Sequence, residues 1–411
     1  MLAGVSLGSL AWARLNLSAV EIERGARVDS LQVGQIFEET LTLNNKSIFP
    51  KLWVEVRDRS NLPGHRTSCV MSLTSHQRKS WRVRTVCRQR GVYKLGPVVM
   101  VTGDPFGLFR FWRRKPQQHE VLVYPPLLDL GAFGLPSTEL SGGAQVRSRS
   151  FNLTPNAVGI REYIAGDPYN RIHWPASARQ QRLMVKEFEL DPTSDLWIVL
   201  DMEMAVQFGN PVAVPQIPKP HDGEKPNPRA SQDYIGDTLG QPVYLPPSTE
   251  EYSVAIAASL AGRLLADKRA VGLIAWGQHH EVINVDRGSR QLLRILRTLA
   301  PLRATGRSPV EEVIAAESVR FARGSTVIVV TSNVDDKWAR SLGALTQRGI
   351  KASAVIVEPA TFVKPNEHQP PSSMLVVGTL AAANVPSYLV KHGAPINVAL
   401  AQGLGGVKVI R

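Results

Sequence analysis

The apolar and polar residues follow two different patterns, one in each half of the chain. In residues 20–125, apolar and polar positions alternate in Trp53–Arg57 and Trp81–Val86, and short apolar runs follow at Val98–Val101 and Val121–Tyr124. Glycine, proline and asparagine residues separate these runs. Short strands divided by turn signals are typical of antiparallel sheets that pack face to face. The pattern therefore predicts an antiparallel β-sandwich over residues 20–125.

From about residue 195 onward, continuous apolar runs alternate with helical spacing. The predicted strands are Leu196–Leu200, Ala270–Trp276, Thr326–Val330 and Ala352–Val357, and the predicted helices are 254–265, 291–302 and 338–345. Continuous apolar runs indicate strands that are buried on both faces. Alternating strands and helices predict a mostly parallel α/β sheet covered by helices, over residues 195–411.

Three segments lie outside these patterns. Residues 1–19 begin with an apolar stretch that is too short to span a bilayer, and we expect either a short element on the body of the protein or the end of a membrane helix that begins upstream. Residues 126–194 are expected to be a linker followed by a motif-rich segment. Residues 207–250 contain nine prolines. They are expected to be a disordered insertion or, less simply, a proline-rich recognition segment.

The composition is that of a globular protein, and the charge is uneven. The 411 residues are 43% hydrophobic and carry a formal net charge of +13. Residues 1–150 hold 21 Lys and Arg against 11 Asp and Glu. This excess favours an anionic surface near the N-terminal domain, either lipid or nucleic acid. Cys69 and Cys87 are too few for a disulfide framework, and we expect both to be reduced and buried.

The densest group of specific residues lies between Arg161 and Arg179. The segment follows the pattern R-x-Y-x-x-G-D at Arg161–Asp167 and continues through I-x-W-x-x-S-A-R at Ile172–Arg179. It resembles the signature of the bacterial family called domain of unknown function 58, although Asn170 stands where that family has an arginine. Arg90–Pro97 is similar to the family's R-G-x-Y-x-L-G-P block, and Asp104–Phe109 is similar to its D-P-F-G-L-F block.

The resemblance implies both an architecture and a partner. Members of the family usually have two N-terminal membrane helices, a β-sandwich and a domain similar to von Willebrand factor type A. They tend to be encoded beside MoxR-type AAA+ ATPases. The resemblance therefore implies a non-catalytic adaptor that works with such an ATPase at the cytoplasmic face of a bacterial membrane.

The signature segment admits several roles. Arginines pair with carboxylates, and exposed aromatic rings suit a protein partner, so the segment is either a latch between the two domains or a partner-docking surface. An alternative is a hydrolase centred on Asp167 and His173, although the sequence contains neither a nucleophile motif nor a P-loop. A nucleic-acid-binding protein is a second alternative to the adaptor. Under the adaptor interpretation, no nucleic-acid partner is expected. The signature residues are Arg161, Tyr163, Gly166, Asp167, Arg171, Trp174, Ser177 and Arg179.

A metal site would lie where the first and third buried strands end. The resemblance implies a divalent cation such as Mg²⁺ held by Asp201, Glu203 and Thr331. Glu203 and Ala205 stand where metal-binding members have serines, so we expect a degraded site. The alternative is that Asp201 caps the end of a strand and contacts nearby backbone.

A basic and aromatic stretch follows the D-P-F-G-L-F block. Arg110, Trp112, Arg113, Arg114 and Lys115 are candidates for contact with anionic lipid headgroups, to which each cation near the surface adds about 1 kcal/mol. The alternative is the exposed end of a β-hairpin with ordinary solvated charges.

Overall fold

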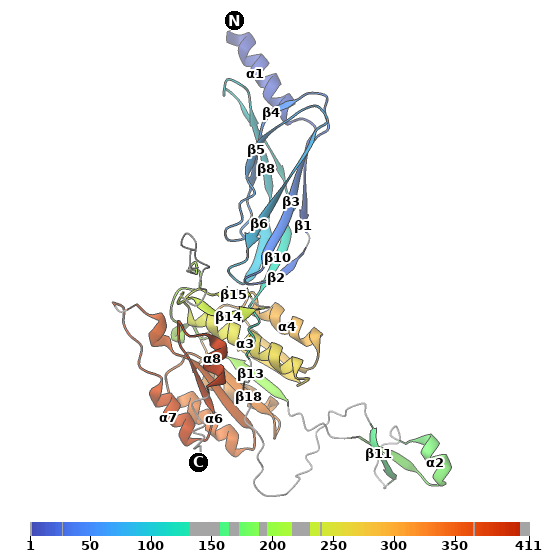
Figure 1. The fold of residues 1–411 in the computed structure, drawn as a ribbon, viewed down its shortest axis with the longest axis vertical. Helices are drawn as coiled ribbons and strands as arrows, with labels where there is room; N and C mark the ends of the chain where they lie inside the picture. The colour runs from blue at the N-terminus through green and yellow to red at the C-terminus, as the bar shows by residue number, and fades with distance from the viewer. Residues whose placement is uncertain are drawn as a thin grey trace, which may run out of the picture.

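The computed structural model describes residues 2–26, 28–130, 133, 157–163, 172–188, 195–215, 231–238, 241–364 and 366–402. Figure 1 shows an elongated molecule in which a slender β-sandwich stands on a larger α/β domain. A single helix, α1 (Leu2–Leu17), lies at the far end of the sandwich. No helix among the described residues combines the length and the apolar character that crossing a bilayer requires.

The N-terminal domain contains the predicted sheets, which are antiparallel throughout except where β2 pairs parallel with β10. One sheet has the order β1-β3-β6, a second β5-β4-β8-β9, and a third β2-β10-β7. Buried and exposed positions alternate along β7, which puts Tyr93 and Leu95 inside. The bounds are β1 (Val20–Ala26), β2 (Ser30–Gln32), β3 (Ile36–Asn45), β4 (Lys51–Asp58), β5 (Cys69–Leu73), β6 (Arg78–Val86), β7 (Gly91–Leu95), β8 (Val98–Gly103), β9 (Arg110–Lys115) and β10 (His119–Tyr124).

The α/β domain is built on one mixed sheet of order β17-β16-β13-β18-β19-β20. All neighbouring strands are parallel except β17, which is antiparallel to β16. The four predicted buried strands are therefore confirmed. The bounds are β13 (Leu196–Leu200), β16 (Val271–Trp276), β17 (His280–Asp286), β18 (Thr326–Thr331), β19 (Lys351–Val357) and β20 (Ser387–Val390).

Helices cover this sheet, and the three predicted helices are confirmed as α3, α4 and α6. A second apolar cluster packs α5 and α6 against the face of the sheet that Trp197 and Val199 line. The bounds are α3 (Thr249–Ala266), α4 (Ser289–Leu299), α5 (Val310–Glu317), α6 (Lys337–Gln347), α7 (Met374–Ala382) and α8 (Ile396–Ala401), with short 3₁₀ turns at η2 (Met204–Val206), η4 (Ser318–Arg320) and η5 (Pro359–Phe362).

The insertion expected to be disordered over residues 207–250 is ordered wherever the structure describes it. Strands β14 (Tyr234–Thr238) and β15 (Gln241–Tyr244) form a hairpin. Its apolar residues Ile235 and Val243 are buried in the core, and helix α3 already begins at Thr249. The expectation was wrong for these residues because a few well-placed apolar side chains are enough to fix a hairpin against an existing core. Residues 216–230 and 239–240 lie outside the described residues.

One apolar core continues from the sandwich into the α/β domain. The cluster joins Phe37, Tyr93 and Val123 of the sandwich to Leu200 and Tyr252 of the α/β domain. Leu128, in the stretch expected to be a linker, belongs to the same cluster, and its N–H donates to Ser259 Oγ at 2.9 Å. A continuous core of this kind holds two domains in a fixed orientation, because separating them would expose its apolar side chains to water.

Candidate functional site

The signature segment forms a small unit of its own. Strands β11 (Ala157–Glu162) and β12 (Met184–Phe188) pair antiparallel, and helix α2 (Trp174–Gln180) lies between them in the sequence. Figure 1 draws β11 and α2 well apart from both larger sheets. An isolated pair of strands is only marginally stable in water, so this unit depends on the local bonds that tie α2 to β12.

Those local bonds come from His173 and Ser177. The Nδ1 atom of His173 accepts a hydrogen bond from the Ala176 N–H at 3.0 Å and so caps the N-terminus of α2. The buried Ser177 hydroxyl donates to the His173 carbonyl at 3.1 Å and accepts from the Met184 N–H at 2.9 Å. The His173 side chain therefore fixes the start of α2, and the Ser177 hydroxyl ties α2 to β12.

The other signature residues fall into three groups. Trp174 is 66% exposed on α2, and Arg179 on the same helix is exposed as well. Tyr163 is half-buried, and its N–H donates to the Leu183 carbonyl at 2.8 Å, while Arg161 lies opposite Val185 in the β11–β12 ladder. Gly166, Asp167 and Arg171 lie outside the described residues. The unit thus presents an aromatic ring and a cation to solvent.

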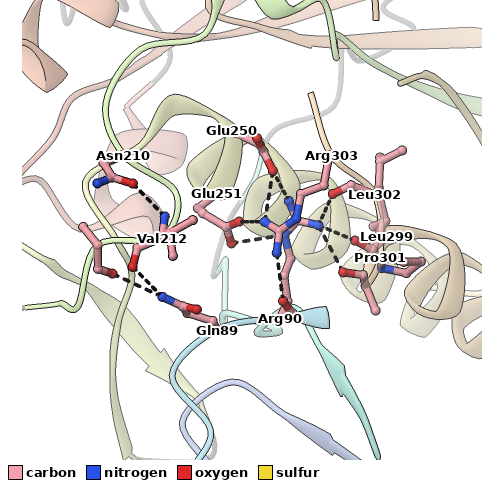
Figure 2. A network of polar contacts seen from close by, with 12 residues as sticks. Gln89, Arg90, Asn210, Val212, Glu250, Glu251, Leu299, Pro301, Leu302 and Arg303 are labelled. Atoms are coloured by element: carbon pink, nitrogen blue, oxygen red, sulfur yellow. Dashed lines mark hydrogen bonds and ion pairs between the residues drawn. The ribbon is translucent and has the colours of Figure 1, made fainter. Parts of the chain in front are cut away.

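The contact that joins the two domains centres on another arginine, Arg90, at the start of the R-G-x-Y-x-L-G-P block. Arg90 is only 1% exposed and lies just before β7, between the start of α3 and the end of α4 (Figure 2). Its Nη2 donates to Glu250 Oε1 at 2.7 Å and its Nε to Glu251 Oε2 at 3.1 Å. Buried charges are stable only when they are paired in this way.

The same guanidinium also closes the end of α4. Its Nη1 donates to the carbonyl of Leu299 at 2.7 Å, to that of Ala300 at 3.2 Å and to that of Leu302. The last carbonyls of a helix lack partners within the helix, and a cation is favourable at that negative end of the helix dipole. Glu250 and Glu251 lie in the first turn of α3, where acidic residues are favourable for the converse reason.

Arg303 and Tyr93 complete the network. Arg303 Nη1 lies 3.2 Å from Glu250 Oε1 and 2.8 Å from Glu251 Oε1, so two guanidiniums balance two carboxylates. The Tyr93 hydroxyl donates to the Gln89 and Arg90 carbonyls, and burial raises the pKa of Tyr93 to about 12. Figure 2 also shows Gln89 reaching Val212 of the insertion, where the amide donates to the carbonyl at 2.9 Å.

The carboxyl ends of β13 and β18 place two of the three candidate metal ligands side by side. Thr331 Oγ1 donates to Asp201 Oδ2 at 2.6 Å, and the Glu203 N–H donates to Asp201 Oδ1 at 3.0 Å. Burial raises the pKa of Asp201 to about 7, despite these two hydrogen bonds. Glu203, which is only half-buried, also has a raised pKa because of partial burial and the nearby Glu311 and Glu312.

This donor set does not fit a magnesium ion. Mg²⁺ needs oxygen ligands in a nearly octahedral arrangement. Both carboxylate oxygens of Asp201 already accept hydrogen bonds, and the Thr331 hydroxyl also accepts one from the Asn333 N–H. Ala205 offers no side-chain oxygen. The geometry instead ties the ends of β13 and β18 together, at the point where the strand order changes direction.

A second buried ionic cluster lies inside the sandwich and was not predicted. His65 Nε2 lies 2.8 Å from Glu39 Oε1, and Arg24 lies 3.1 Å from Glu39 and 2.7 Å from Asp58. One ligand atom each of Glu39, Asp58 and His65 falls within 4.8 Å of the others. Arg24 already supplies a positive charge to both carboxylates, so the arrangement suits an internal ion cluster better than a site for a metal cation.

The sequence contains a signal for each of the two buried ionic clusters, the one around Arg90 and the one around Glu39. Glu39 occupies the same side of β3 as the buried residues Phe37, Leu41 and Leu43, which marks it as a charged residue inside a core. Arg90 precedes a strand whose alternate residues are buried. In both cases the sequence marks a charged residue beside buried positions, whereas it does not reveal which residues pair with that charge.

The five basic and aromatic candidates lie on β9, near the end of the sandwich farthest from the α/β domain. Trp112 is 69% exposed, and Arg110 and Arg114 are exposed beside it. Arg113 Nη1 reaches the Val20 carbonyl at 3.4 Å, and Lys115 donates to the Ile22 carbonyl. Of the five, Arg113 and Lys115 therefore help to join β9 to β1.

Comparison with solved structures finds only partial similarities. The CARDB domain of the PF1109 protein from Pyrococcus furiosus has a TM-score of 0.19 and 16% identity, and the match covers 25% of this chain and 91% of that chain. The alkylpurine DNA glycosylase AlkC of Pseudomonas fluorescens also has a TM-score of 0.19 and 16% identity, over 26% of this chain and 30% of that chain. TM-scores this low carry no argument about function.

Comparison with protein families and curated sequences gives a consistent result. Residues 159–214 match the family model described as "Protein of unknown function DUF58". A protein of Bacillus subtilis (strain 168), described as "Uncharacterized protein YeaD", is 22% identical over 339 residues, which cover 78% of this chain and 72% of that protein. The matched segment contains all of Arg161–Arg179 and, together with this relative, supports placing the chain in the DUF58 family of proteins of unknown function.

Proposed function

We propose that this chain is a non-catalytic adaptor that binds a MoxR-type AAA+ ATPase through the β11–α2–β12 unit at the cytoplasmic face of a bacterial membrane. The observation that carries the proposal is the exposure of Trp174, with Arg179, on a unit that projects from the body of the protein. Tryptophan and arginine are the residue types most often found to dominate binding energy at protein interfaces.

The rest of the molecule suits a rigid support for such a unit. Buried ion pairs and a continuous apolar core fix the sandwich on the α/β domain. The strand order β17-β16-β13-β18-β19-β20, with β17 antiparallel, supports a von Willebrand A-like architecture for that domain.

No observation among the described residues favours the hydrolase hypothesis. Asp167 lies outside them, and His173 uses its Nδ1 atom to cap α2.

The direct test is binding of the purified full-length chain to a purified MoxR-type ATPase from the same genome, measured by calorimetry without lipid. The test variant is Trp174→Ala with Arg179→Ala. The control is Trp112→Ala with Arg114→Ala, which removes the same two residue types from exposed positions on β9. We expect the test variant to weaken binding at least about tenfold and the control to leave it unchanged. Absence of binding by the wild-type chain would refute the partner, and equal losses in both variants would refute the docking unit.

A further inference from the structure

The end of the sandwich opposite the α/β domain is unusually apolar for a surface in water. We call this end the sandwich tip, and it includes α1, the loop between β8 and β9, the first residues of β9, and the turn between β3 and β4 (Figure 1). Contiguous exposed apolar groups on a soluble protein mark a surface that binds something. Its most exposed large apolar side chains are those of Leu7, Ile48, Phe49, Phe106, Leu108 and Trp112.

Helix α1 is fixed to the tip from Ser9, which is buried, to its C-terminus. Lys51 Nζ donates to the Leu15 carbonyl at 2.6 Å, and Asn16 Nδ2 donates to the Trp53 carbonyl at 3.2 Å. Ala13 and Leu17 are buried beneath the helix. These contacts hold α1 on the sandwich from Ser9 onward, and the first turns before Ser9 project beyond it (Figure 1).

The projecting turns are apolar on several sides. Val5, Leu7 and Leu10 are all exposed, and no charged residue precedes Arg14. A helix that lies flat on a membrane has one polar face, whereas a helix that is apolar all round is normally surrounded by apolar material. The first turns of α1 therefore suit end-on entry into an apolar phase.

The loop between β8 and β9 is held in a shape that presents more apolar groups. Asp104 accepts hydrogen bonds from the N–H groups of Phe106 at 2.9 Å and Phe109 at 2.6 Å, and its side chain is turned into the loop. Phe106 is then 71% exposed at the apex, with Leu108 exposed beside it. Because the loop is held by its own hydrogen bonds, little conformational freedom would be lost when it enters another phase.

Cations surround this apolar surface. Arg14, Arg110 and Arg114 are exposed around it. Of the nearby acidic groups, Glu21 is paired with Lys46, Glu55 beside Arg110 is paired with Arg57, and Asp104 is bonded to backbone. Two cationic tips would repel each other, whereas a bilayer that contains anionic headgroups offers both an apolar interior and the opposite charge.

We infer that the sandwich tip docks on an anionic phospholipid bilayer, with the first turns of α1 and the Phe106–Leu108 apex in the acyl region and Arg14, Arg110 and Arg114 among the headgroups. Trp12, Trp53 and Trp112 are also exposed, and tryptophan is enriched where proteins meet the membrane interface. The inference rests on the membrane location in the proposed function and identifies the surface that would make the contact.

The experiment measures flotation of the full chain with vesicles of phosphatidylcholine mixed with phosphatidylglycerol, and with vesicles of phosphatidylcholine alone. The wild-type chain should float with the mixed vesicles and much less with the neutral ones. Phe106→Ser with Leu108→Ser should lower affinity at least about tenfold. Arg110→Gln and Arg114→Gln should each lower it about fivefold and reduce its dependence on salt.

The matched control is Met374→Ser with Leu375→Ser on α7, where the two side chains are 65% and 66% exposed on the α/β domain. This variant should bind the mixed vesicles as the wild-type chain does. The inference fails if the wild-type chain ignores anionic vesicles or if the control loses as much affinity as the tip variant.

Sedimentation in the absence of lipid distinguishes another occupant. If the wild-type chain forms a dimer that Phe106→Ser with Leu108→Ser dissociates, the tip binds a second copy and the inference is overturned. Binding of the ATPase to β11–α2–β12 is measured without lipid, so failure of one proposal leaves the result of the other intact.

Discussion

The two ends of the β-sandwich use the same residue types in opposite ways. At the domain junction, Arg90 and Tyr93 are buried, and every polar contact of the guanidinium described above is made within the protein. At the sandwich tip, Arg110, Arg114 and Trp112 are exposed to solvent. The difference is made by the surroundings. At the junction the ends of α3 and α4 enclose the guanidinium, whereas at the tip Arg110 has the Glu55 carboxylate nearby but stays exposed to solvent.

The contrast separates an internal joint from an external surface. A buried arginine that loses its carboxylates is costly, so the junction has to be closed for the fold to be stable. An exposed arginine contributes little to folding, so the tip is free to meet another surface. The residue types at the two ends of the sandwich therefore do not distinguish them. Substitutions should do so, because they should change the free energy of unfolding much more at the junction than at the tip.

Of the substitutions considered, Arg90→Met is expected to lower the free energy of unfolding the most. Methionine fills similar space but leaves Glu250 and Glu251 without their buried partner, with only Arg303 still near them. Removing one member of a buried ion pair typically lowers the free energy of unfolding by about 3–5 kcal/mol. Urea unfolding monitored by circular dichroism measures this change.

The control for Arg90 is Arg84→Met. Arg84 pairs with Glu38 on the exposed face of the β1-β3-β6 sheet, and its loss should lower the free energy of unfolding by less than about 1 kcal/mol. A triple variant with Arg90→Met, Glu250→Gln and Glu251→Gln should regain part of the stability, because no carboxylate then remains buried without a counter-charge. Equal costs for Arg90→Met and Arg84→Met would mean that the junction is not a closed joint.

The next largest change in the free energy of unfolding concerns Asp201, which directly follows β13. Its pKa is raised to about 7 by burial, above the value of an unfolded chain, so the protonated form is favoured in the folded state. The resulting stability is fully present below about pH 4 and is lost as the pH rises to about 7, with a total of the order of 4 kcal/mol. Asp201→Asn cannot ionise and should remove most of this slope. Urea midpoints at pH 5 and pH 8 give the comparison, and an unchanged slope in the variant would assign it to another group.

A smaller effect is expected at the tip from Lys51→Met. Lys51 donates from a buried position to the Leu15 carbonyl and so holds the end of α1. Loss of a charged hydrogen bond costs about 1.5–3 kcal/mol, and methionine should recover part of that through apolar contacts. Lys79→Met is the control, because Lys79 donates to the Ser72 carbonyl from an exposed position. Faster proteolytic cleavage of α1 in Lys51→Met alone would confirm that this bond anchors the helix.

The strands and helices of the α/β domain could be predicted because burial imposes a strong pattern. Leu196–Leu200 and Thr326–Thr331 are buried at every position, and such runs are visible in a sequence without knowledge of their neighbours. The hairpin of β14 and β15 could not be predicted, because two short strands, each with few apolar residues and one with a proline, are fixed only by a core that other segments build.

The candidate site could be predicted only in part. The sequence pointed to Arg161–Arg179, and the exposed Trp174 keeps the docking hypothesis open. The domain joint was missed because Arg90 meets Glu250 and Glu251 across about 160 positions of sequence, and no local pattern records such a pair. Local periodicity carries information about burial, whereas the choice of partner depends on how distant elements pack.

The smallest effect on stability is expected from Phe106→Ser with Leu108→Ser. Both side chains are exposed, so the folded and unfolded states offer them similar contact with water, and the free energy of unfolding should change by less than about 0.5 kcal/mol. The buried Phe37→Ser, in the core beside Tyr93, should by contrast cost about 3–5 kcal/mol. A loss above about 1 kcal/mol in the tip variant would show that these residues pack against the protein in solution, and the tip would then not be an open surface. If the tip variant keeps its stability but loses vesicle binding, the apolar apex contributes to binding a membrane and not to folding. The residues at the junction, by contrast, contribute to folding.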